Sequence, residues 1–221
     1  MLKADLHIHT QFSPDSELSP ERLVERCLKV GLNCIAVTDH NSIEGALAVK
    51  EIAPFRVIVG EEVASASGEV TGLFLEREVP AHLPAEETGR LIKEQGGLIS
   101  LPHPFDRFRS KVITPDGIDE ILPHVDIVEA FNARNNFNSD NLRAEELARQ
   151  HGLLVSAVSD SHTAVELGRT YTEIPDFDGT AEGFKQALTN ATLVRKRTTP
   201  LIHVFTTLTK AKKRILGRTR H

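Results

Sequence analysis

The chain of 221 residues has few of the residues that mark several protein classes. It contains no tryptophan and one tyrosine, which argues against a platform of stacked aromatic rings for single-stranded nucleic acid. Two cysteines, Cys27 and Cys34, are too few for a disulfide framework or a CxxC site, so we expect a reducing, cytoplasmic location. No run approaches the ~18 apolar residues that span a membrane, and we expect no secretory signal at the N-terminus.

Several catalytic motifs are also missing. There is no helix-opening glycine-rich phosphate loop, no GxSxG elbow and no cysteine nucleophile, which excludes nucleotide-motor, serine-hydrolase and thiol mechanisms. What is present is typical of one globular domain, with 40% hydrophobic and 26% charged residues.

Charge is distributed unevenly along the chain. Nine of the 26 basic residues lie in 195–221, which has no Asp or Glu, so 17 basic residues accompany 31 acidic ones before it. We therefore expect one domain over 1–195 and a basic C-terminal extension over 196–221, packed on that domain or frayed from it. An acidic body is a poor polyanion binder unless metal cations reverse its local field.

Short β-branched apolar runs alternate with stretches of helical period. Repeated β-α units predict an α/β fold, either a small barrel or an open doubly wound sheet. The predicted strands are Leu2–His7, Cys34–Thr38, Arg56–Val63, Leu98–Leu101, Val125–Ala130 and Leu153–Val158, with Val70–Leu75 pairing with the third. The predicted helices are Pro20–Val30, Ser42–Ile52, Pro84–Gln95, Pro115–Leu122, Asp140–His151 and Thr180–Asn190, while Thr199–Ile215 fits helix or strand.

Histidines and carboxylates follow the ends of most predicted strands. In the first strand, alternation places Asp5, His7 and His9 on one face. Glu61 and Glu62 follow Gly60, and alternation along the strand turns one of them away from the other strand ends. We favour Glu62 as the acid that faces them. Because the carboxyl ends of parallel strands lie on one side of a sheet, these groups should converge. The predicted metal ligands are His7, His9, Asp15, His40, Glu62, His103, Asp160 and His162, while the remaining five histidines (His82, His124, His151, His203 and His221) are predicted to be ordinary surface residues.

The motifs match a known family in order. HxH (7–9), Ser-x-Asp-Ser around Asp15, TDHN (38–41), the Glu after Gly60, PHP (102–104), EAFNAR (129–134) and SDSH (159–162) resemble the polymerase and histidinol phosphatase (PHP) superfamily of metal-dependent phosphoesterases. The resemblance covers about residues 3–175 and implies a distorted (β/α)7 barrel with the metal site at the strand C-termini.

The resemblance also implies how the ligands divide. His7, His9, Glu62 and Asp160 would form one site, Asp15, His40 and His162 a second, and Glu62 would bridge to a third cation near His103. Two departures concern that third site. No histidine follows the fifth strand, where only Glu129, Asn132 and Arg134 are available, and none lies in residues 63–76.

Imidazole and carboxylate ligands without thiolate suit two or three divalent transition metals, Zn²⁺, Mn²⁺ or Fe²⁺. Such clusters serve metal-assisted hydrolysis, here of a phosphate monoester of a nucleotide, an oligonucleotide end or a small metabolite, with a metal-bridging hydroxide as nucleophile. The expected catalytic residues are Asp15, His40, Glu62, Asp160 and His162; the expected phosphate-binding residues are Arg134, Arg107, Arg109 and Arg169. Asp5 and Asp39 are candidates to orient the ligating histidines.

Two alternatives stay open. An amidohydrolase also begins with HxH on a β/α barrel, but no lysine ends a predicted strand here, and Asp15 and the PHP tripeptide would go unexplained. A non-catalytic, metal-binding PHP module is the other. The expected partner is a phosphorylated small molecule or a nucleotide; nucleic acid is compatible but not indicated, and no membrane or obligate protein partner is expected.

Overall fold

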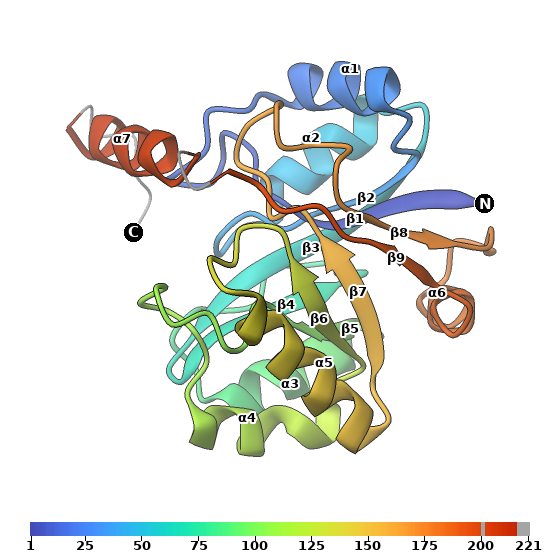
Figure 1. Cartoon of the computed structure of the whole chain (residues 1–221), viewed down its shortest axis with the longest axis vertical. Helices are drawn as coiled ribbons and strands as arrows, with labels where there is room; N and C mark the ends of the chain where they lie inside the picture. The colour runs from blue at the N-terminus through green and yellow to red at the C-terminus, as the bar shows by residue number, and fades with distance from the viewer. Residues whose placement is uncertain (200–201, 216–221) are drawn as a thin grey trace.

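A nine-stranded sheet forms the centre of the computed structural model, which describes residues 1–199 and 202–215 (Figure 1). The strands follow the spatial order β7-β6-β5-β4-β3-β2-β1-β8-β9. Their bounds are β1 (Leu2–Ile8), β2 (Cys34–Val37), β3 (Arg56–Ser65), β4 (Gly68–Leu73), β5 (Leu98–Leu101), β6 (Ile127–Asn132), β7 (Leu154–Val158), β8 (Tyr171–Ile174) and β9 (Thr192–Val194).

Strand directions in this sheet are mixed. The neighbours β1-β2-β3 and β5-β6-β7 run parallel, as the β-α alternation predicts. In contrast, β4 is antiparallel to both β3 and β5. At the other edge of the sheet, β8 is antiparallel to β1, and β9 is antiparallel to β8. The α/β class and the pairing of the Val70–Leu75 segment with the third strand are thus confirmed. The strands are not parallel throughout the sheet, because β3 turns directly back into β4 without a crossover helix.

The sheet closes where β7, one of its two end strands, meets β1 and β8. Just beyond the C-terminal end of β7, a parallel bridge joins Ile8 to Ser161, and the amide of His9 donates to the Ser161 carbonyl at 2.8 Å. Within β7 itself, the Thr172 hydroxyl of β8 bonds both the amide and the carbonyl of Ala157, at 2.9 and 3.1 Å. The sheet is therefore a nearly closed barrel, which confirms the barrel-like α/β prediction.

The helices begin and end largely where the sequence signals predict. The Ser19 hydroxyl caps α1 by accepting from the Arg22 amide, and Gly31 ends it in the left-handed conformation. At α2, Ile43 occupies the N-cap position, and the hydroxyl of the preceding Ser42 accepts from the Glu44 amide at 3.1 Å. The helices are α1 (Pro20–Val30), α2 (Glu44–Ile52), α3 (Ala85–Glu94), α4 (Pro115–Ile121), α5 (Asn138–His151), α6 (Ala181–Leu188) and α7 (Ile202–Ile215), with a 3₁₀ turn at Leu122–His124.

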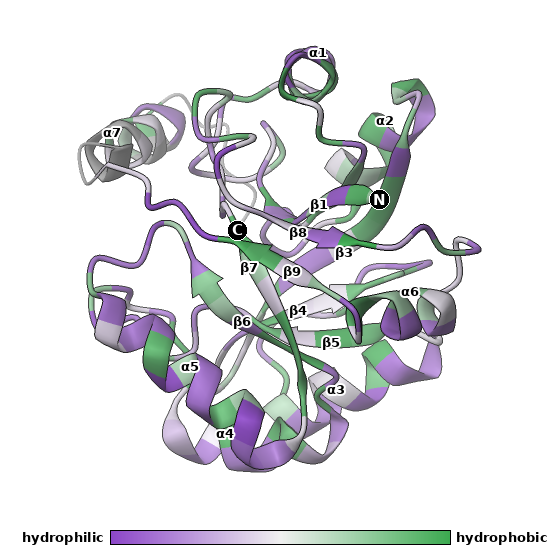
Figure 2. Ribbon diagram, turned by 45° about the vertical axis from the view of Figure 1, so that its right-hand side comes forward, coloured by the Kyte–Doolittle hydropathy of each residue, from purple (hydrophilic) through white to green (hydrophobic). Residues whose placement is uncertain are grey.

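Helices cover the barrel unevenly (Figure 1). α1 and α2 lie beside β1 and β2, whereas α3, α4 and α5 lie on the far side and α6 lies next to β8 and β9. Apolar and polar residues alternate along α4 and α5 (Figure 2), and the apolar residues that these helices bury are Ile118 and Ile121 of α4 and Ala144 and Ala148 of α5. The apolar core sits between these helices and the sheet, while the open ends of the parallel strands remain available to polar residues.

Part of the basic C-terminal extension, Ile202–Ile215, forms α7. Of the two alternatives for the Thr199–Ile215 segment, helix and strand, its described part is therefore mainly helix. Lys212 pairs with Glu17 at 2.7 Å, and the Lys213 ammonium donates to the carbonyls of Gln11 and Ser13 at 2.7 and 2.6 Å. The described part of the extension is therefore packed on the loop after β1 rather than frayed. Among the described residues, no helix has both the length and the apolar character to cross a membrane.

Two glycines with positive φ offer a matched test of this packing. Gly31 (φ 77°) has open space where a Cβ would stand, but a Cβ on Gly168 (φ 85°) would meet Val30 Cβ at 2.5 Å. We expect Gly31→Ala to lower the free energy of unfolding by about 1 kcal/mol and Gly168→Ala by about 2–4 kcal/mol, because only the second adds a clash to the backbone cost. Denaturant unfolding measures both, and equal losses would contradict the packing of Gly168 on α1.

Candidate metal centre

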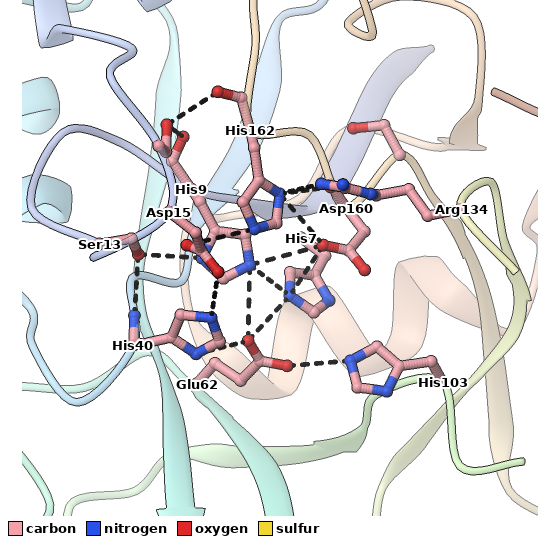
Figure 3. A network of polar contacts seen from close by, with 12 residues as sticks. His7, His9, Ser13, Asp15, His40, Glu62, His103, Arg134, Asp160 and His162 are labelled. Carbon is pink, nitrogen blue, oxygen red and sulfur yellow. Dashed lines mark hydrogen bonds and ion pairs between the residues drawn. The ribbon is translucent and has the colours of Figure 1, made fainter. Parts of the chain in front are cut away.

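All eight predicted ligand residues converge at the C-terminal ends of the barrel strands (Figure 3). They come from β1 and the loop after it, from β3, and from the segments that follow β2, β5 and β7. Their ligand atoms fall into groups within 4.8 Å of one another. The groups are His7–His9–Asp160, His9–Asp15–His40–His162, His7–Glu62–His103 and His40–Glu62–Glu69.

The centre of the cluster is a close approach of two imidazoles. His7 Nε2 and His9 Nε2 lie 3.0 Å apart, and Glu62 Oε2 lies 3.4 Å from each. Asp160 Oδ1 is 3.8 Å from His7 Nε2 and 3.5 Å from His9 Nε2. Figure 3 shows these four side chains pointing toward one another.

The outer nitrogens of both rings bind oxygen acceptors. His7 Nδ1 lies 2.6 Å from Glu129 Oε1, and His9 Nδ1 lies 3.0 Å from the Ser13 hydroxyl, which itself donates to Asp39. A neutral imidazole that donates through Nδ1 presents a lone pair at Nε2. Two such lone pairs and two carboxylate oxygens then face one point, and a divalent cation is the group that satisfies all of them.

Buried atoms without partners support the same fit. Among the described residues, several predicted ligand atoms are buried and make no hydrogen bond, although a buried unsatisfied polar group costs about 1–3 kcal/mol. They are Asp15 Oδ1, His40 Nδ1, Glu62 Oε2, His103 Nδ1 and Asp160 Oδ1.

A second group lies nearer the surface around Asp15. Asp15 Oδ2 is 3.4 Å from His40 Nε2, and Asp15 Oδ1 is 3.4 Å from His162 Nε2. Glu62 connects this group to the centre, because Glu62 Oε2 is 3.1 Å from His40 Nδ1 while Oε1 is 3.1 Å from His103 Nε2. Glu61, in contrast, accepts from the Val79 amide and lies apart from the cluster, in keeping with our choice of Glu62.

Glu69 joins the cluster although the sequence reasoning missed it. Its carboxylate lies 3.6 Å from His40 Nδ1 and 3.9 Å from His103 Nε2. In the hairpin, Glu62 pairs with Thr71 and Ala64 with Glu69, so Glu69 shares a face with Glu62. A hairpin register extended back from Val70 by one residue would have found it. It lies in the same segment, 63–76, that contains no histidine.

Irregular pairing in β1 separates Asp5 from the site. Asp5 pairs with Ile35 but Ile8 with Val37, so three steps along β1 match two along β2. Asp5 accepts from the Ser159 amide, and it interacts with His7 through the His7 backbone and through charge rather than through a hydrogen bond to the ring. Glu129 makes the hydrogen bond to His7 Nδ1 that we expected of Asp5.

A similar irregularity in β6 brings Glu129 and Asn132 to one place. The register with β7 shifts between Glu129 and Phe131, and Asn132 Nδ2 donates to both Glu129 Oε2 and Asp160 Oδ2, at 2.9 and 3.1 Å. Asn132 therefore supports Asp160. Asp160 and His103 also hold positive φ values, 52° and 30°, a costly backbone state that concentrates at functional sites.

The histidines titrate according to their neighbours. Burial would lower the pKa of His7, but three carboxylates, Glu129 foremost, raise it well above its usual value. Burial is also outweighed at His40, where Asp15 is the main cause of a pKa raised to about 9. His9 differs, because burial and the nearby His162 lower its pKa to about 3.

Three carboxylates of the cluster are held in the ionised form, whereas burial and the nearby Glu62 raise the pKa of Glu69. Burial alone would raise the pKa values of Asp15, Glu62 and Asp160, yet neighbouring imidazoles, and Arg109 at Asp160, hold all three well below their usual range. Ionised carboxylates and the raised pKa values of His7 and His40 show that this pocket favours positive charge. Either a proton or a metal ion can supply that charge.

The four predicted arginines divide two and two. Arg109 contacts Asp160 and Asp106, and Arg134 contacts His162, so both reach the cluster. Arg107 instead binds Asp140 and Ser139 of α5. Arg169 is exposed and does not line the cavity above the cluster.

A cavity of about 730 Å³ opens over the Asp15 side of the cluster. Arg109, Arg134 and His162 line it together with Phe108 and Phe137. α7 supplies Thr206 and Thr207, and the Thr206 hydroxyl accepts from Arg134 Nη2 at 3.0 Å. Five histidines were predicted to lie at the surface. Of these, His82 and His151 are exposed and His124 is half-buried, while the side chain of His203 and residue His221 lie outside the described part of the chain.

Glu129→Gln tests the orienting role of this carboxylate. We expect metal affinity to fall about 10–100-fold, because the amide binds His7 Nδ1 less strongly and leaves the ring less basic. Metal content after dialysis against a graded chelator measures the loss. Glu61→Gln, a change of the same kind at a buried acid outside the cluster, should leave affinity unchanged, and an equal effect of the two changes would contradict the assignment.

The comparisons with known proteins agree with this geometry. The PHP domain model matches residues 5–96 and the PHP-associated model matches residues 138–193. A two-domain protein from Bacteroides vulgatus that contains a predicted PHP-like metal-dependent phosphoesterase superposes with a TM-score of 0.63 at 20% identity, over 88% of this chain and 65% of that one. A lesion-specific endonuclease from Pyrococcus furiosus superposes with a TM-score of 0.57 at 17% identity, over 87% and 57%.

These solved structures share the fold, and a closer relative adds sequence identity. An uncharacterized protein from Methanocaldococcus jannaschii is 37% identical over 181 residues, which cover 80% of this chain and 72% of the relative. With both family models matching along the same chain, this identity shows that the chain belongs to the PHP domain family.

Proposed function

We propose that this protein is a metal-dependent phosphoesterase that hydrolyses a phosphate monoester with the help of two or three divalent cations. The observation that carries the proposal is the facing pair of imidazole nitrogens, His7 Nε2 and His9 Nε2, with ionised carboxylates around them. The similarity to a PHP-like metal-dependent phosphoesterase supports the reaction class.

The donor geometry suggests how the ligands divide. One cation would take His7, His9, Glu62 and Asp160, a second would take Asp15, His40 and His162, and a third would take His103 with Glu62 and Glu69. Glu69 would thus supply the ligand for which residues 63–76 offer no histidine. Bound cations supply Lewis acidity toward phosphoryl oxygens and activate water near neutral pH.

The chain's own residues prepare the cavity for a phosphate. Arg134 is buried and held by the Asp160 carbonyl at 3.3 Å and by the Thr206 hydroxyl, so its guanidinium is fixed at the cavity wall. Arg109 pairs with Asp160 and Asp106 and lines the same cavity. Two fixed guanidiniums beside an anionic substrate bind it through planar, charge-assisted hydrogen bonds and neutralise charge that develops on its oxygens.

The alternatives explain fewer of these contacts. No described strand ends in a lysine, which an amidohydrolase of the carbamylated-lysine type would need, and Asp15 would have no role there. A non-catalytic metal-binding module would not need two buried or half-buried arginines at the wall of an open cavity.

Turnover of p-nitrophenyl phosphate with added Mn²⁺ tests the proposal. We expect activity that EDTA abolishes and that His9→Ala or Asp160→Ala lowers by at least about 100-fold, because each removes a buried ligand. His82→Ala, at an exposed histidine far from the cluster, is the matched control and should retain full activity. Chelator-resistant turnover, or metal-loaded protein inert toward phosphate esters but active on amides, would contradict it.

The same assay separates monoesters from diesters. The proposal expects faster turnover of p-nitrophenyl phosphate than of bis(p-nitrophenyl) phosphate, whose second ester group removes one of the charges that Arg109 and Arg134 would bind. The reverse order would assign the site to diester hydrolysis.

A further inference from the structure

Two phenylalanines stand exposed side by side on the wall of the cavity above the metal cluster. Phe108 is 64% exposed and Phe137 is 45% exposed. Their rings are stacked, with centroids 5.6 Å apart and planes inclined by 21°. Both line the 730 Å³ cavity that also contains Asp15, Arg134 and His162.

This aromatic pair is held in place. The Arg107 guanidinium lies over the Phe137 ring, 5.0 Å from its centroid, and donates to the fully buried carboxylate of Asp140 at 2.7 Å. Phe108 and Arg107 are adjacent in one loop, while Phe137 and Asp140 lie at the start of α5. The ion pair therefore ties the two loops together and fixes the rings where solvent reaches them.

Single exposed apolar residues are common and need no explanation, but a fixed, stacked pair inside a charged cavity differs from them. The cavity is lined by metal-ligand candidates and two guanidiniums, which suit a phosphate. The same cavity exposes two aromatic rings, and the face of an aromatic ring suits a planar base. A ligand that carries both chemistries, phosphate and planar aromatic base, is a nucleoside phosphate.

The size of the site agrees with one nucleotide. Cavities that bind small molecules measure about 300–1,000 Å³, and this cavity falls within that range. A pair of rings offers a stacking surface for one base rather than for a strand. The scarcity of aromatic residues in the sequence therefore excludes an extended platform without excluding this one.

We propose that Phe108 and Phe137 form a base-stacking subsite and that the substrate is a nucleoside phosphate, either free or at the end of an oligonucleotide. This inference rests on the proposed phosphoesterase function. Hydrolysis adds water across the phosphorus–oxygen ester bond, so that the nucleoside leaves with a hydroxyl and inorganic phosphate is released. The phenylalanines take no part in that step and act on binding.

The test compares esters with and without a base. With Mn²⁺ present, kcat and KM are measured for adenosine 5′-monophosphate, adenosine 3′-monophosphate and ribose 5-phosphate. We expect kcat/KM for at least one adenosine phosphate to exceed that for ribose 5-phosphate by about tenfold or more, as stacking on one aromatic surface provides. Phe108→Leu and Phe137→Leu should remove most of this preference through KM, so that the kcat/KM values for the adenosine phosphates and for ribose 5-phosphate converge.

Two further variants guard against a structural explanation. Phe108→Trp keeps an aromatic surface and should keep the preference. Phe12→Leu makes the same change at an exposed phenylalanine that does not line this cavity, and should leave the ratio of the two kcat/KM values unchanged. Thermal unfolding of each variant shows whether it is folded. A short oligonucleotide with a terminal phosphate, run in parallel, distinguishes a chain end from a free nucleotide.

The outcomes separate this inference from the proposed function. Turnover of ribose 5-phosphate without any preference for adenosine phosphates, or a preference that survives Phe108→Leu, overturns the base-stacking subsite and leaves the phosphoesterase in place. If no ester is hydrolysed, the proposed function fails, and calorimetric titration of adenosine 5′-monophosphate and 3′-monophosphate into the Mn²⁺-loaded protein still decides the subsite. Equal affinities of wild type and Phe108→Leu would then overturn it.

Discussion

The site depends on the one place where the sheet closes. The bridge between Ile8 and Ser161 joins the first strand of the barrel to the segment after the seventh, more than 150 residues later in the chain. That bridge brings His7 and His9 within reach of Asp160, and no local contact could do so. Because Ser161 lies between two ligand candidates, the hydrogen bonds that close the barrel also fix the spacing of the cluster.

Electrostatics explains why so acidic a body can serve an anionic substrate. Buried carboxylates such as Glu62 and Asp160 are held ionised by their neighbours, so the pocket demands compensating positive charge. Polar residues behind the cluster hold its histidine rings in place. Glu129 bonds His7 Nδ1, and Asp39 accepts from the Ser13 hydroxyl that bonds His9 Nδ1. The acidity that seemed to oppose phosphate binding is what prepares the site for cations.

Local signals predicted much of this arrangement, and long-range pairing accounts for the rest. The helix Pro20–Val30 was predictable to the residue because a serine cap, a proline and a glycine mark its ends. In contrast, β8 and β9 are only four and three residues long, and β8 joins the sheet through β1 at the start of the chain, so no periodicity predicted them. The order of the motifs located the predicted ligands. The place of Glu69 depends on the register of the β3–β4 hairpin, and the place of Glu129 depends on a register shift between β6 and β7. No motif marks either position.

The helix α7 lies beyond the last residue that either family model matches, residue 193, yet it forms part of the cavity wall through Thr206 and Thr207. Lys213 also fastens it to the loop that carries Asp15. Relatives that share the metal ligands can therefore differ in which molecules they admit, since this wall is free to diverge without disturbing the ligands.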